Sequence, residues 1–594
     1  MYYLCQFCIK FQLNTMLNLK ITSLFMLCLF LLPANAQQKW FNPMNTDYPV
    51  IQNQGWTKEI GNSYARLPQR AKSEVREPLW NLSRNSAGLA IHFYSNANNI
   101  TIRYKVEGSY SMPHMPNTGV SGIDLYAIDS DGNLKLASGS YKWGDTISFN
   151  YKIDAKDKYH NLGFEYRLYL PTYTSVKWLE IGIPENADLE FIPLREELPI
   201  VAYGTSITQG ACATRPGMAW TNIVSRSLDL PVINLGFSGN GKLEKEVINY
   251  INELDAQLYI LDCLPNLPGY KEEDVFKKVV DAVKQIRSKH NTPILLTEHA
   301  GYSNAGLDTT RLRDYTIPNK ASRKAYERLL ADGVKDLWYL SNDELNFSMD
   351  SWVDYVHPSD LGMQFYADAY NKKIREILKM SKGNLTTTCP VTQRREPGNY
   401  EWLKRHREIL QMNKANPPKA VVFGNSIMHF WGGEPKGPRS TGKDSWEAYM
   451  EPLGFRNFGY GWDRIENVLW RVYHGELDGY KADRILIKIG TNNFGVNSDK
   501  EILAGLDFLY KAIRQRQPEA TVTVLGILPR RGMEKRVASI NKEISKLAKK
   551  QGFIYKNVNK DLLLSNGQIN ESLFGDGLHP NAEGYKIIGK KITE

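Results

Sequence analysis

Two patterns of apolar and polar residues divide the chain. From about residue 39 to residue 193, short apolar stretches are separated by polar turns, and residues 100–106 alternate strictly between apolar and polar side chains. Alternation with a period of two is typical of strands that bury one face. Further strands are expected over residues 89–94, 122–126 and 167–170, with no helical period of useful length between them. We therefore predict a β-sandwich of jelly-roll type over residues 37–195.

Beyond residue 196 the pattern changes to buried strands that alternate with amphipathic helices. Strands are expected over residues 200–203, 232–235, 258–261, 294–297 and 338–340, and helices over residues 273–290, 321–334 and 363–380. The alternation then returns, with helices over residues 400–412, 500–517 and 533–551, strands over residues 484–489, 521–525 and 553–558, and a last helix from residue 582. This order is typical of a mostly parallel sheet covered by helices on both faces. We predict two α/β domains, over residues 196–380 and 400–594, joined by a polar linker over residues 381–399.

Each α/β domain contains the same short motif. A strand runs into Gly204-Thr-Ser206-Ile in the first domain and into Gly424-Asn-Ser426-Ile in the second. Far downstream stand Asp354-Tyr-Val-His357-Pro and Asp576-Gly-Leu-His579-Pro, with serine-to-histidine separations of 151 and 153 residues. Because ligands bind at the carboxyl ends of the strands in such sheets, both serines are candidate nucleophiles. The matching separations favour two domains of one design over coincidence.

Serine, histidine and aspartate are the groups that acyl transfer requires. Serine becomes an effective nucleophile when a base takes its proton, and the pKa of histidine suits that task near neutral pH. An aspartate three residues before the histidine lets one loop carry both residues, with the carboxylate orienting the ring. The alternative is that each Asp and His pair only caps the closing helix of its domain.

Two more blocks lie between the serine and the histidine of each domain. The first domain has Asn234-Leu-Gly-Phe-Ser-Gly239 and Cys263-Leu-Pro-Asn266, and the second has Asn457-Phe-Gly-Tyr-Gly-Trp462 and Gly490-Thr-Asn492. This ordered set resembles the SGNH (GDSL-type) hydrolases, which are esterases and lipases with a flavodoxin-like α/β/α fold. In both copies a glycine and an apolar helix follow the Asp-x-x-His-Pro motif, as in the family's last block, which favours a catalytic role over capping.

The resemblance implies roles for ten residues. The catalytic residues would be Ser206, Asp354 and His357 in the first copy and Ser426, Asp576 and His579 in the second. The oxyanion hole would use Gly239 and Asn266 in the first copy and Trp462 and Asn492 in the second. Both copies depart from the family pattern, since no glycine precedes Asn266 in its block and Trp462 stands where the family has glycine. The tryptophan keeps the backbone N–H and adds a side chain that we expect to favour acetyl over longer acyl groups.

The β-sandwich carries a resemblance of its own. The stretch Gly122-Ile-Asp124-Leu-Tyr126 looks like the G-x-D-L-Y signature of a domain that precedes some SGNH esterases. Four aromatic residues of this region could stack on sugars, namely Trp143, Tyr169, Tyr173 and Trp178. In a sandwich, however, most aromatic side chains belong to the core.

Composition and charge change this picture little. A chain of 594 residues is too long for a single core. The formal charge is +10, and it falls to +8 without Lys10 and Lys20 of the expected leader, which over this length indicates a solvated surface. No basic cluster is interleaved with aromatic residues, so no nucleic-acid partner is expected. No Cys/His cluster has metal spacing and no nucleotide-binding motif is present in context, so no metal or cofactor is expected.

The N-terminus predicts export. Lys20 precedes an apolar run over residues 21–32, followed by Ala34-Asn-Ala36, which is the order of a secretory signal over residues 1–36. The run is too short for a comfortable membrane span, so no stable membrane insertion is expected. The start could be Met1 or Met16. Only three cysteines follow the signal, too few for a disulfide framework even in the oxidising periplasm or outside the cell.

The resemblance also implies a substrate class, because SGNH enzymes with this domain arrangement are largely carbohydrate esterases that remove acetyl groups. No long apolar lid is present in the sequence. We therefore expect a secreted serine esterase that removes acyl groups, most of all acetyl, from plant-type polysaccharide or oligosaccharide. One alternative is a lipase or lysophospholipase. Another is that one α/β unit binds carbohydrate without turnover.

Overall fold

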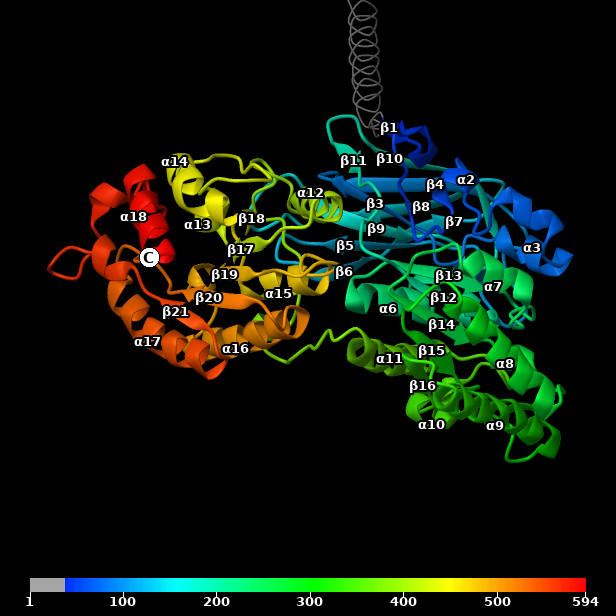
Figure 1. Cartoon of the computed structure of the whole chain (residues 1–594). Helices are drawn as coiled ribbons and strands as arrows, with labels where there is room; N and C mark the ends of the chain where they lie inside the picture. The colour runs from blue at the N-terminus through cyan, green and yellow to red at the C-terminus, as the bar shows by residue number, and fades with distance from the viewer. Residues whose placement is uncertain (1–37) are drawn as a thin grey trace, which may run out of the picture.

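The computed structural model describes residues 38–594, which form three units arranged in two halves (Figure 1). One half holds the β-sandwich and the first α/β domain, and the other holds the second α/β domain. The expected signal, residues 1–36, lies outside the described residues. Within residues 38–594, no helix has the length and apolar character needed to cross a membrane.

The N-terminal unit is a sandwich of two antiparallel sheets. Its strands are β1 (Gln38–Phe41), β2 (Ile51–Gln52), β3 (Ala90–Ser95), β4 (Asn99–Glu107), β5 (Asp124–Ile128), β6 (Leu134–Ala137), β7 (Gly139–Lys142), β8 (Ile147–Lys152), β9 (Phe164–Tyr169), β10 (Ser175–Pro184) and β11 (Leu189–Phe191). One sheet has the order β1-β10-β4-β8-β7, and the other has the order β11-β3-β9-β5-β6 with β2 paired to β3. Along β4 the alternate residues Ile100, Ile102 and Tyr104 are buried in the sandwich core, as their period of two predicts.

One part of the sandwich region differs from the prediction. Short helices α2 (Thr57–Ile60) and α3 (Glu77–Ser83) stand between β2 and β3, and α4 (Asn117–Val120) precedes β5. Trp56, Leu79 and Trp80 from the first two helical stretches pack with Val201 and Leu235 of the neighbouring α/β sheet. These apolar residues belong to the core of the next domain, which a search for periodicity within the sandwich could not reveal.

The first α/β domain is a five-stranded parallel sheet. Its strands are β12 (Ile200–Gly204), β13 (Val232–Gly236), β14 (Leu258–Asp262), β15 (Ile294–Thr297) and β16 (Leu337–Leu340), in the order β13-β12-β14-β15-β16. Its helices are α5 (Ser206–Gln209), α6 (Trp220–Leu228), α7 (Lys245–Ile251), α8 (Glu272–Arg287), α9 (Thr309–Ala331), α10 (Asn342–Leu345) and α11 (Asp360–Ile377). Helix α9 begins at Thr309 and not near Ala321, because the Asp308 side chain accepts from two N–H groups of its first turn.

The second α/β domain repeats this design. Its strands are β17 (Ala420–Gly424), β18 (Phe455–Gly459), β19 (Arg484–Lys488), β20 (Thr521–Leu525) and β21 (Ile554–Lys556), in the order β18-β17-β19-β20-β21. Its helices are α12 (Trp402–Ala415), α13 (Ser426–His429), α14 (Lys443–Ser445), α15 (Ile465–Tyr473), α16 (Asp499–Arg516), α17 (Glu534–Lys550) and α18 (Ala582–Thr593). The strand order 2-1-3-4-5 is that of flavodoxin-like sheets, so the predicted fold class is confirmed for both domains.

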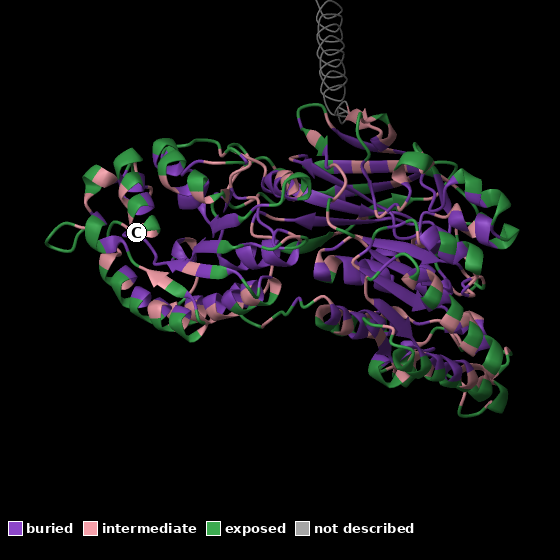
Figure 2. Cartoon of the chain, viewed as in Figure 1, coloured by how far each residue is buried: buried purple, intermediate pink, exposed green. Residues whose placement is uncertain are grey.

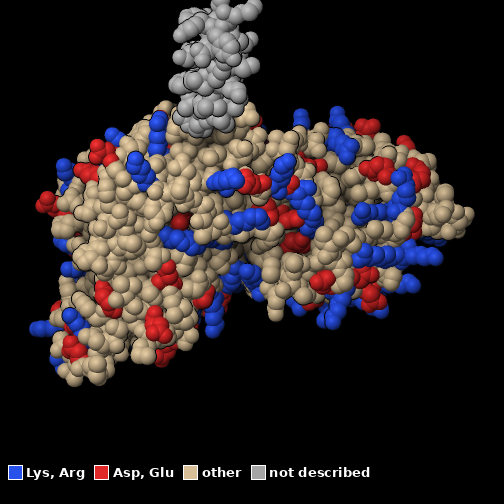
Figure 3. Space-filling model, turned by 180° about the vertical axis from the view of Figure 1, so that it is seen from behind, with Lys and Arg blue, Asp and Glu red and all other residues tan. Residues whose placement is uncertain are grey.

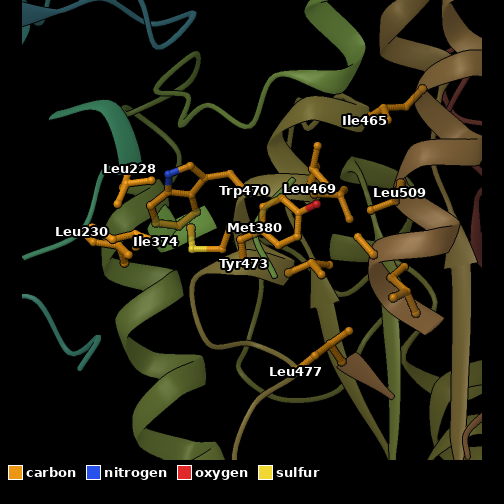
Figure 4. Packing of buried hydrophobic residues seen from close by; sticks show 14 of the residues in the cluster. Leu228, Leu230, Ile374, Met380, Ile465, Leu469, Trp470, Tyr473, Leu477 and Leu509 are labelled. Carbon is orange, nitrogen blue, oxygen red and sulfur yellow. The ribbon is translucent and has the colours of Figure 1, made fainter. Parts of the chain in front are cut away.

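The two α/β domains share a buried apolar interface. Leu228, Ile374 and Met380 of the first domain surround Trp470 of the second (Figure 4), and all four belong to one continuous core. The Trp470 indole N–H donates to Asp229 Oδ2 across this interface at 2.8 Å. Buried residues accordingly continue from the strands of each sheet into the junction (Figure 2), and the domains pack as one body.

We predicted a polar linker over residues 381–399, and in the structure this segment makes specific contacts with the units that it connects. Thr387 Oγ1 donates to the Glu501 carbonyl of α16 at 2.8 Å. Arg395 is buried and pairs with Asp131 of the β-sandwich at 2.7 Å, and Arg464 pairs with the same carboxylate at 3.2 Å. The polar residues of the segment 381–399 thus serve as ion-pair and hydrogen-bond partners at the junction.

On the surface, basic and acidic side chains are intermixed over the back of the molecule (Figure 3).

Candidate active site

Both candidate nucleophiles lie at the carboxyl end of the first strand of their sheet. Ser206 follows β12 and Ser426 follows β17, and each begins a one-turn helix whose N-cap, Thr205 or Asn425, accepts from the N–H two residues on. A Cβ at Gly204 would lie 2.0 Å from Thr208 Oγ1 and 2.8 Å from the Asp262 carbonyl oxygen. Only glycine therefore lets the chain turn this closely after the strand. In both sheets the second strand lies on one side of the first strand, and the third, fourth and fifth strands lie on the other side. In folds of this kind, ligands bind at the carboxyl ends of the strands where the strand order changes direction in this way.

The first site joins Ser206, His357 and Asp354 in one hydrogen-bonded chain. Ser206 Oγ lies 2.9 Å from His357 Nε2, and His357 Nδ1 lies 2.8 Å from Asp354 Oδ2. The other carboxylate oxygen of Asp354 accepts from the backbone N–H groups of Val356 and His357 at 2.8 and 2.7 Å. The loop is closed by a bridge between Trp352 and Pro358. Aspartate and histidine are thus fixed relative to each other by the backbone as well as by their side chains.

The second site has the same arrangement. Ser426 Oγ lies 2.9 Å from His579 Nε2, and His579 Nδ1 lies 2.7 Å from Asp576 Oδ2. Asp576 Oδ1 accepts from the N–H groups of Leu578 and His579, and Phe574 and Pro580 bridge to close the loop. The structure therefore brings together all six residues for which the resemblance implies a catalytic role.

The electrostatic surroundings of the two sites keep both aspartates ionised. Burial raises the pKa of Asp354 and of Asp576, but hydrogen bonds from the paired histidine outweigh it and leave the pKa of each carboxyl below its ordinary value. In the second site burial lowers the pKa of His579, the nearby charges of Arg439 and Lys488 lower it further, and Asp576 opposes them. The net result is a histidine whose pKa is below 6.5 and which is neutral, as a base must be, at neutral pH.

The first site presents three N–H donors around Ser206. Gly239 follows β13 with φ +68°, and its N–H has no protein partner among residues 38–594. Asn266 Oδ1 accepts from the Gly241 N–H at 3.0 Å, which fixes the amide and leaves Nδ2 without a partner in the described chain. The N–H of Ser206 itself is at the start of a helix, where no intrahelical acceptor exists. These groups are suitable donors to a developing oxyanion.

Trp462 adopts the backbone conformation of the glycine that it replaces. Its φ is +61°, compared with +68° at Gly239, and this left-handed conformation costs a residue with a side chain about 1–2 kcal/mol. The indole is 43% exposed and lies 6.0 Å from the ring of Tyr159, a residue of the β-sandwich. The Trp462 side chain is therefore exposed beside the half-buried ring of Tyr159 and does not fill the site. Asn492 Nδ2 donates to the Asp463 carbonyl at 3.0 Å, which leaves its second amide hydrogen for another acceptor.

The β-sandwich contributes contacts to the first site that sequence reasoning missed. Asp124 of the G-x-D-L-Y stretch accepts from the Gly217 N–H at 2.6 Å and from Arg215 at 2.9 Å, and Tyr126 OH also accepts from Arg215. Tyr173 OH donates to the carbonyl oxygen of Ser206 at 3.2 Å. The signature was visible in the sequence, but its docking role was not, since its partners Arg215 and Gly217 lie 89 to 93 residues away. Of the four aromatics singled out in the sequence, Tyr169 and Tyr173 are buried, outside the main core of the sandwich, and Trp143 and Trp178 are half-buried.

Two further histidines near the strand ends are structural. His299 and His429 are both 1% exposed, and each accepts a backbone N–H at Nδ1, from Gly301 and Gly461 respectively. Burial lowers the pKa of His299 to about 3 and that of His429 to about 2, so both rings are neutral. A cavity of about 760 Å³ between Met412 and Trp446 of the second domain contains none of the ten predicted site residues.

Comparisons with known proteins agree with this architecture. Sequence models described as the GDSL-like Lipase/Acylhydrolase family match residues 197–375 and 422–587, and one described as the N-terminus of Esterase_SGNH_hydro-type matches residues 38–189. A crystal structure described as that of a GDSL-like lipase from Bacteroides ovatus is 31% identical, covers 58% of this chain and 98% of its own, and superposes with a TM-score of 0.52. Platelet-activating factor acetylhydrolase IB subunit alpha2 of Homo sapiens is 29% identical over 204 residues, which are 33% of this chain and 84% of that protein.

The matches cover the three units that the fold defines, in the same order, and the B. ovatus protein matches over nearly its whole length. The chain therefore belongs to the GDSL-like lipase/acylhydrolase family of SGNH hydrolases, with two hydrolase domains in tandem behind a GxDLY-type N-terminal domain.

Proposed function

We propose that this hydrolase is a serine esterase that removes acetyl groups from carbohydrate, with both α/β domains active. The observation that carries the proposal is the complete serine–histidine–aspartate chain in each domain, with Ser–His distances of 2.9 Å in both. A neutral histidine within this distance of a hydroxyl can act as its general base.

The proposed reaction proceeds through an acyl-enzyme. The serine Oγ attacks the ester carbonyl while histidine Nε2 takes its proton, and backbone and asparagine N–H groups receive the negative charge on the carbonyl oxygen. The C–O bond to the sugar then breaks, and the histidine gives its proton to the departing alkoxide. Water attacks the acetyl-serine in the same way, releases acetate and restores the serine. Loss of one oxyanion donor typically costs about 10²–10³ in rate.

The carbohydrate part of the proposal is supported by the exposed side chain of Trp462, with the half-buried ring of Tyr159 beside it, at the second oxyanion position. Sugar rings pack well on such half-exposed aromatic faces. The acetyl part is supported by the matched relative, an acetylhydrolase. Because the named substrate of that relative is platelet-activating factor, an acetyl ester of a lipid is the second candidate.

The test is to compare Ser206→Ala, Ser426→Ala and the double variant on acetylated polysaccharides, on an acetylated phospholipid and on 4-nitrophenyl acetate. We expect each single variant to keep part of the acetate release from polysaccharide and the double variant to lose it. A fluorophosphonate probe should label each single variant at the remaining serine. If one single variant is unlabelled and inactive, the remaining domain is a binding module; if the lipid alone is hydrolysed, the carbohydrate proposal is wrong.

Export by the N-terminal signal belongs to the same proposal. Its basis is the order of charged, apolar and small residues ending at Ala36. N-terminal sequencing of the protein from the periplasm or medium should begin at Gln37, whereas retention of the leader on a cytoplasmic protein would contradict export.

A further inference from the structure

The β-sandwich places a histidine against the base of the first active site. The ring of His114 stacks on the ring of His357, with centroids 5.4 Å apart and planes 22° apart. His114 is held in a tight turn in which Met112 and Met115 exchange backbone hydrogen bonds of 3.0 and 3.1 Å. The Met115 side chain packs in one cluster with Cys212, which follows the nucleophile turn. Residues from three distant parts of the chain thus meet at one point.

These three side chains have the composition and spacing of a metal site. One ligand atom each from His114, Cys212 and His357 lies within 4.8 Å of the other two. Cys212 is 2% exposed, and its N–H donates to the Pro358 carbonyl at 3.1 Å, which fixes it beside the histidine loop. His114 and His357 are partly exposed, so a cation can reach the cluster from solvent. Zinc requires about 2.0–2.3 Å to nitrogen and sulfur, which small movements of the His114 turn can supply.

The hydrogen bond from His357 to Asp354 orients the catalytic histidine as it would be oriented in a metal site. Asp354 holds His357 Nδ1 at 2.8 Å and leaves the Nε2 lone pair for Ser206 Oγ, 2.9 Å away, or for a metal that displaces this contact. A carboxylate that orients a histidine in this way is the usual partner of zinc-binding imidazoles. Two imidazoles and one thiolate suit a soft divalent cation such as Zn²⁺, with the fourth position left for water.

We propose that His114, Cys212 and His357 form an inhibitory zinc site that switches off the first active site. Zinc occupies the Nε2 lone pair that otherwise takes the proton of Ser206, so acyl transfer in this domain stops. The Cys212 thiol gives its proton to solvent on binding.

The second active site provides an internal control. There the ring beside the catalytic histidine is Phe430, 5.4 Å from His579, and it comes from the same domain. The residue six positions after the nucleophile, which is Cys212 in the first copy, is Gly432 in the second. Neither residue can ligate a metal, so the proposal predicts that zinc distinguishes the two sites.

The activity test uses the full chain with 4-nitrophenyl acetate. The Ser426→Ala variant reports the first site and the Ser206→Ala variant reports the second. We expect Zn²⁺ to inhibit the former, with reversal by EDTA, at concentrations that leave the latter active. In the Ser426→Ala background, His114→Phe, which copies the second site, and Cys212→Ser should each raise the half-inhibitory Zn²⁺ concentration about tenfold or more, relative to their own metal-free rates.

A second readout does not depend on esterase activity. Co²⁺ bound to the Ser206→Ala protein should give a thiolate-to-cobalt charge-transfer band in the near ultraviolet, and Zn²⁺ should displace it. The band should be absent from the Ser206→Ala/Cys212→Ser double variant. Absence of the band from the parent protein would overturn the proposal whether or not the first site is an esterase, and where both sites are active, equal inhibition of both by zinc would also overturn it.

Discussion

Asp262 and Lys488 occupy the same position in the two sheets and carry opposite charges. Asp262 ends β14 and pairs with Gly204, and Lys488 ends β19 and pairs with Gly424, so each stands beside a nucleophile turn. Both are fully buried. Thr208 Oγ1 donates to Asp262 Oδ2 at 3.3 Å, whereas Lys488 Nζ has no partner within residues 38–594. Burial raises the pKa of Asp262 to about 7 and lowers the pKa of Lys488 to about 7.

Asp262 should reduce stability at neutral and alkaline pH. Its pKa rises from 3.8 in the unfolded chain to about 7 in the fold, so its stabilising contribution is complete below pH 3.8 and is lost as the pH rises to about 7. We expect Asp262→Asn, which keeps an acceptor for Thr208, to raise the melting temperature at pH 8 and to have little effect near pH 4. Asp255→Asn, at an exposed position before β14, is the control. An unchanged or lower melting temperature at pH 8 would contradict the prediction.

Lys488 should show the opposite pH dependence. Its pKa falls from 10.5 in the unfolded chain to about 7 in the fold, so its contribution to stability is present above pH 10.5 and is lost as the pH falls to about 7. Lys488→Met should therefore raise the melting temperature more at pH 6 than at pH 10. Exposed Lys560→Met serves as the matched variant. An equal gain at both pH values would show that packing, and not charge burial, is responsible.

The aspartates of the two sites should support turnover and not binding. Asp354→Asn in the Ser426→Ala background, and Asp576→Asn in the Ser206→Ala background, should lower kcat by about 10²–10⁴ and change KM little. The reason is that the carboxylate stabilises the imidazolium that forms in the transition state. Steady-state kinetics on 4-nitrophenyl acetate gives both constants. A loss below about tenfold would indicate a Ser/His dyad with the ring held by the backbone.

The second site should remain active at lower pH than an ordinary histidine permits. Because the pKa of His579 is below 6.5 and the base must be neutral, kcat/KM should fall only as the pH falls through that lower value. Arg439 stacks on Phe430 at 4.0 Å, beside His579, and its charge contributes to the shift. We expect Arg439→Ala to move the acid limb of the Ser206→Ala enzyme upward. Arg484→Ala, at the opposite end of β19 from Lys488, should leave the limb in place; an identical limb in both variants would exclude the charge of Arg439 as a cause.

Trp462 should act on carbohydrate substrates through its exposed indole. Glycine suits the φ of +61° at this position and keeps the N–H, so Trp462→Gly removes only the aromatic surface. In the Ser206→Ala background, kcat/KM for an acetylated oligosaccharide should fall about 2- to 10-fold relative to that for 4-nitrophenyl acetate. Tyr159→Leu should act in the same direction. If Trp462→Gly instead increases the rate on butyryl esters and leaves the sugar substrate unaffected, the indole is a wall of the acyl pocket.

Much of the architecture is determined locally and was therefore predictable. Strands such as β12, β15 and β17 are short apolar runs that end at glycine or polar residues, and their alternation with amphipathic helices specifies a parallel sheet. The motif around Ser206 and the Asp-x-x-His loop at His357 could be matched because each spans only a few residues. Their meeting at 2.9 Å depends on the fold, which places the loop that carries His357, between α10 and α11, beside the end of β12.

The tertiary structure decided what depends on contacts between distant segments. The sequence did not indicate that Asp124 and Tyr173 would hold the nucleophile turn, that His114 would stack on His357, or that Arg395 of the connecting segment would be buried against Asp131. Each of these contacts joins surfaces of different units, where no periodicity within one segment reports the partner. The sequence alone determined the three folds and the two Ser–His–Asp sets, because these follow from local pattern and motif order. The packing of the β-sandwich on the first active site arose only in the assembled chain, because it depends on how three separate cores fit together.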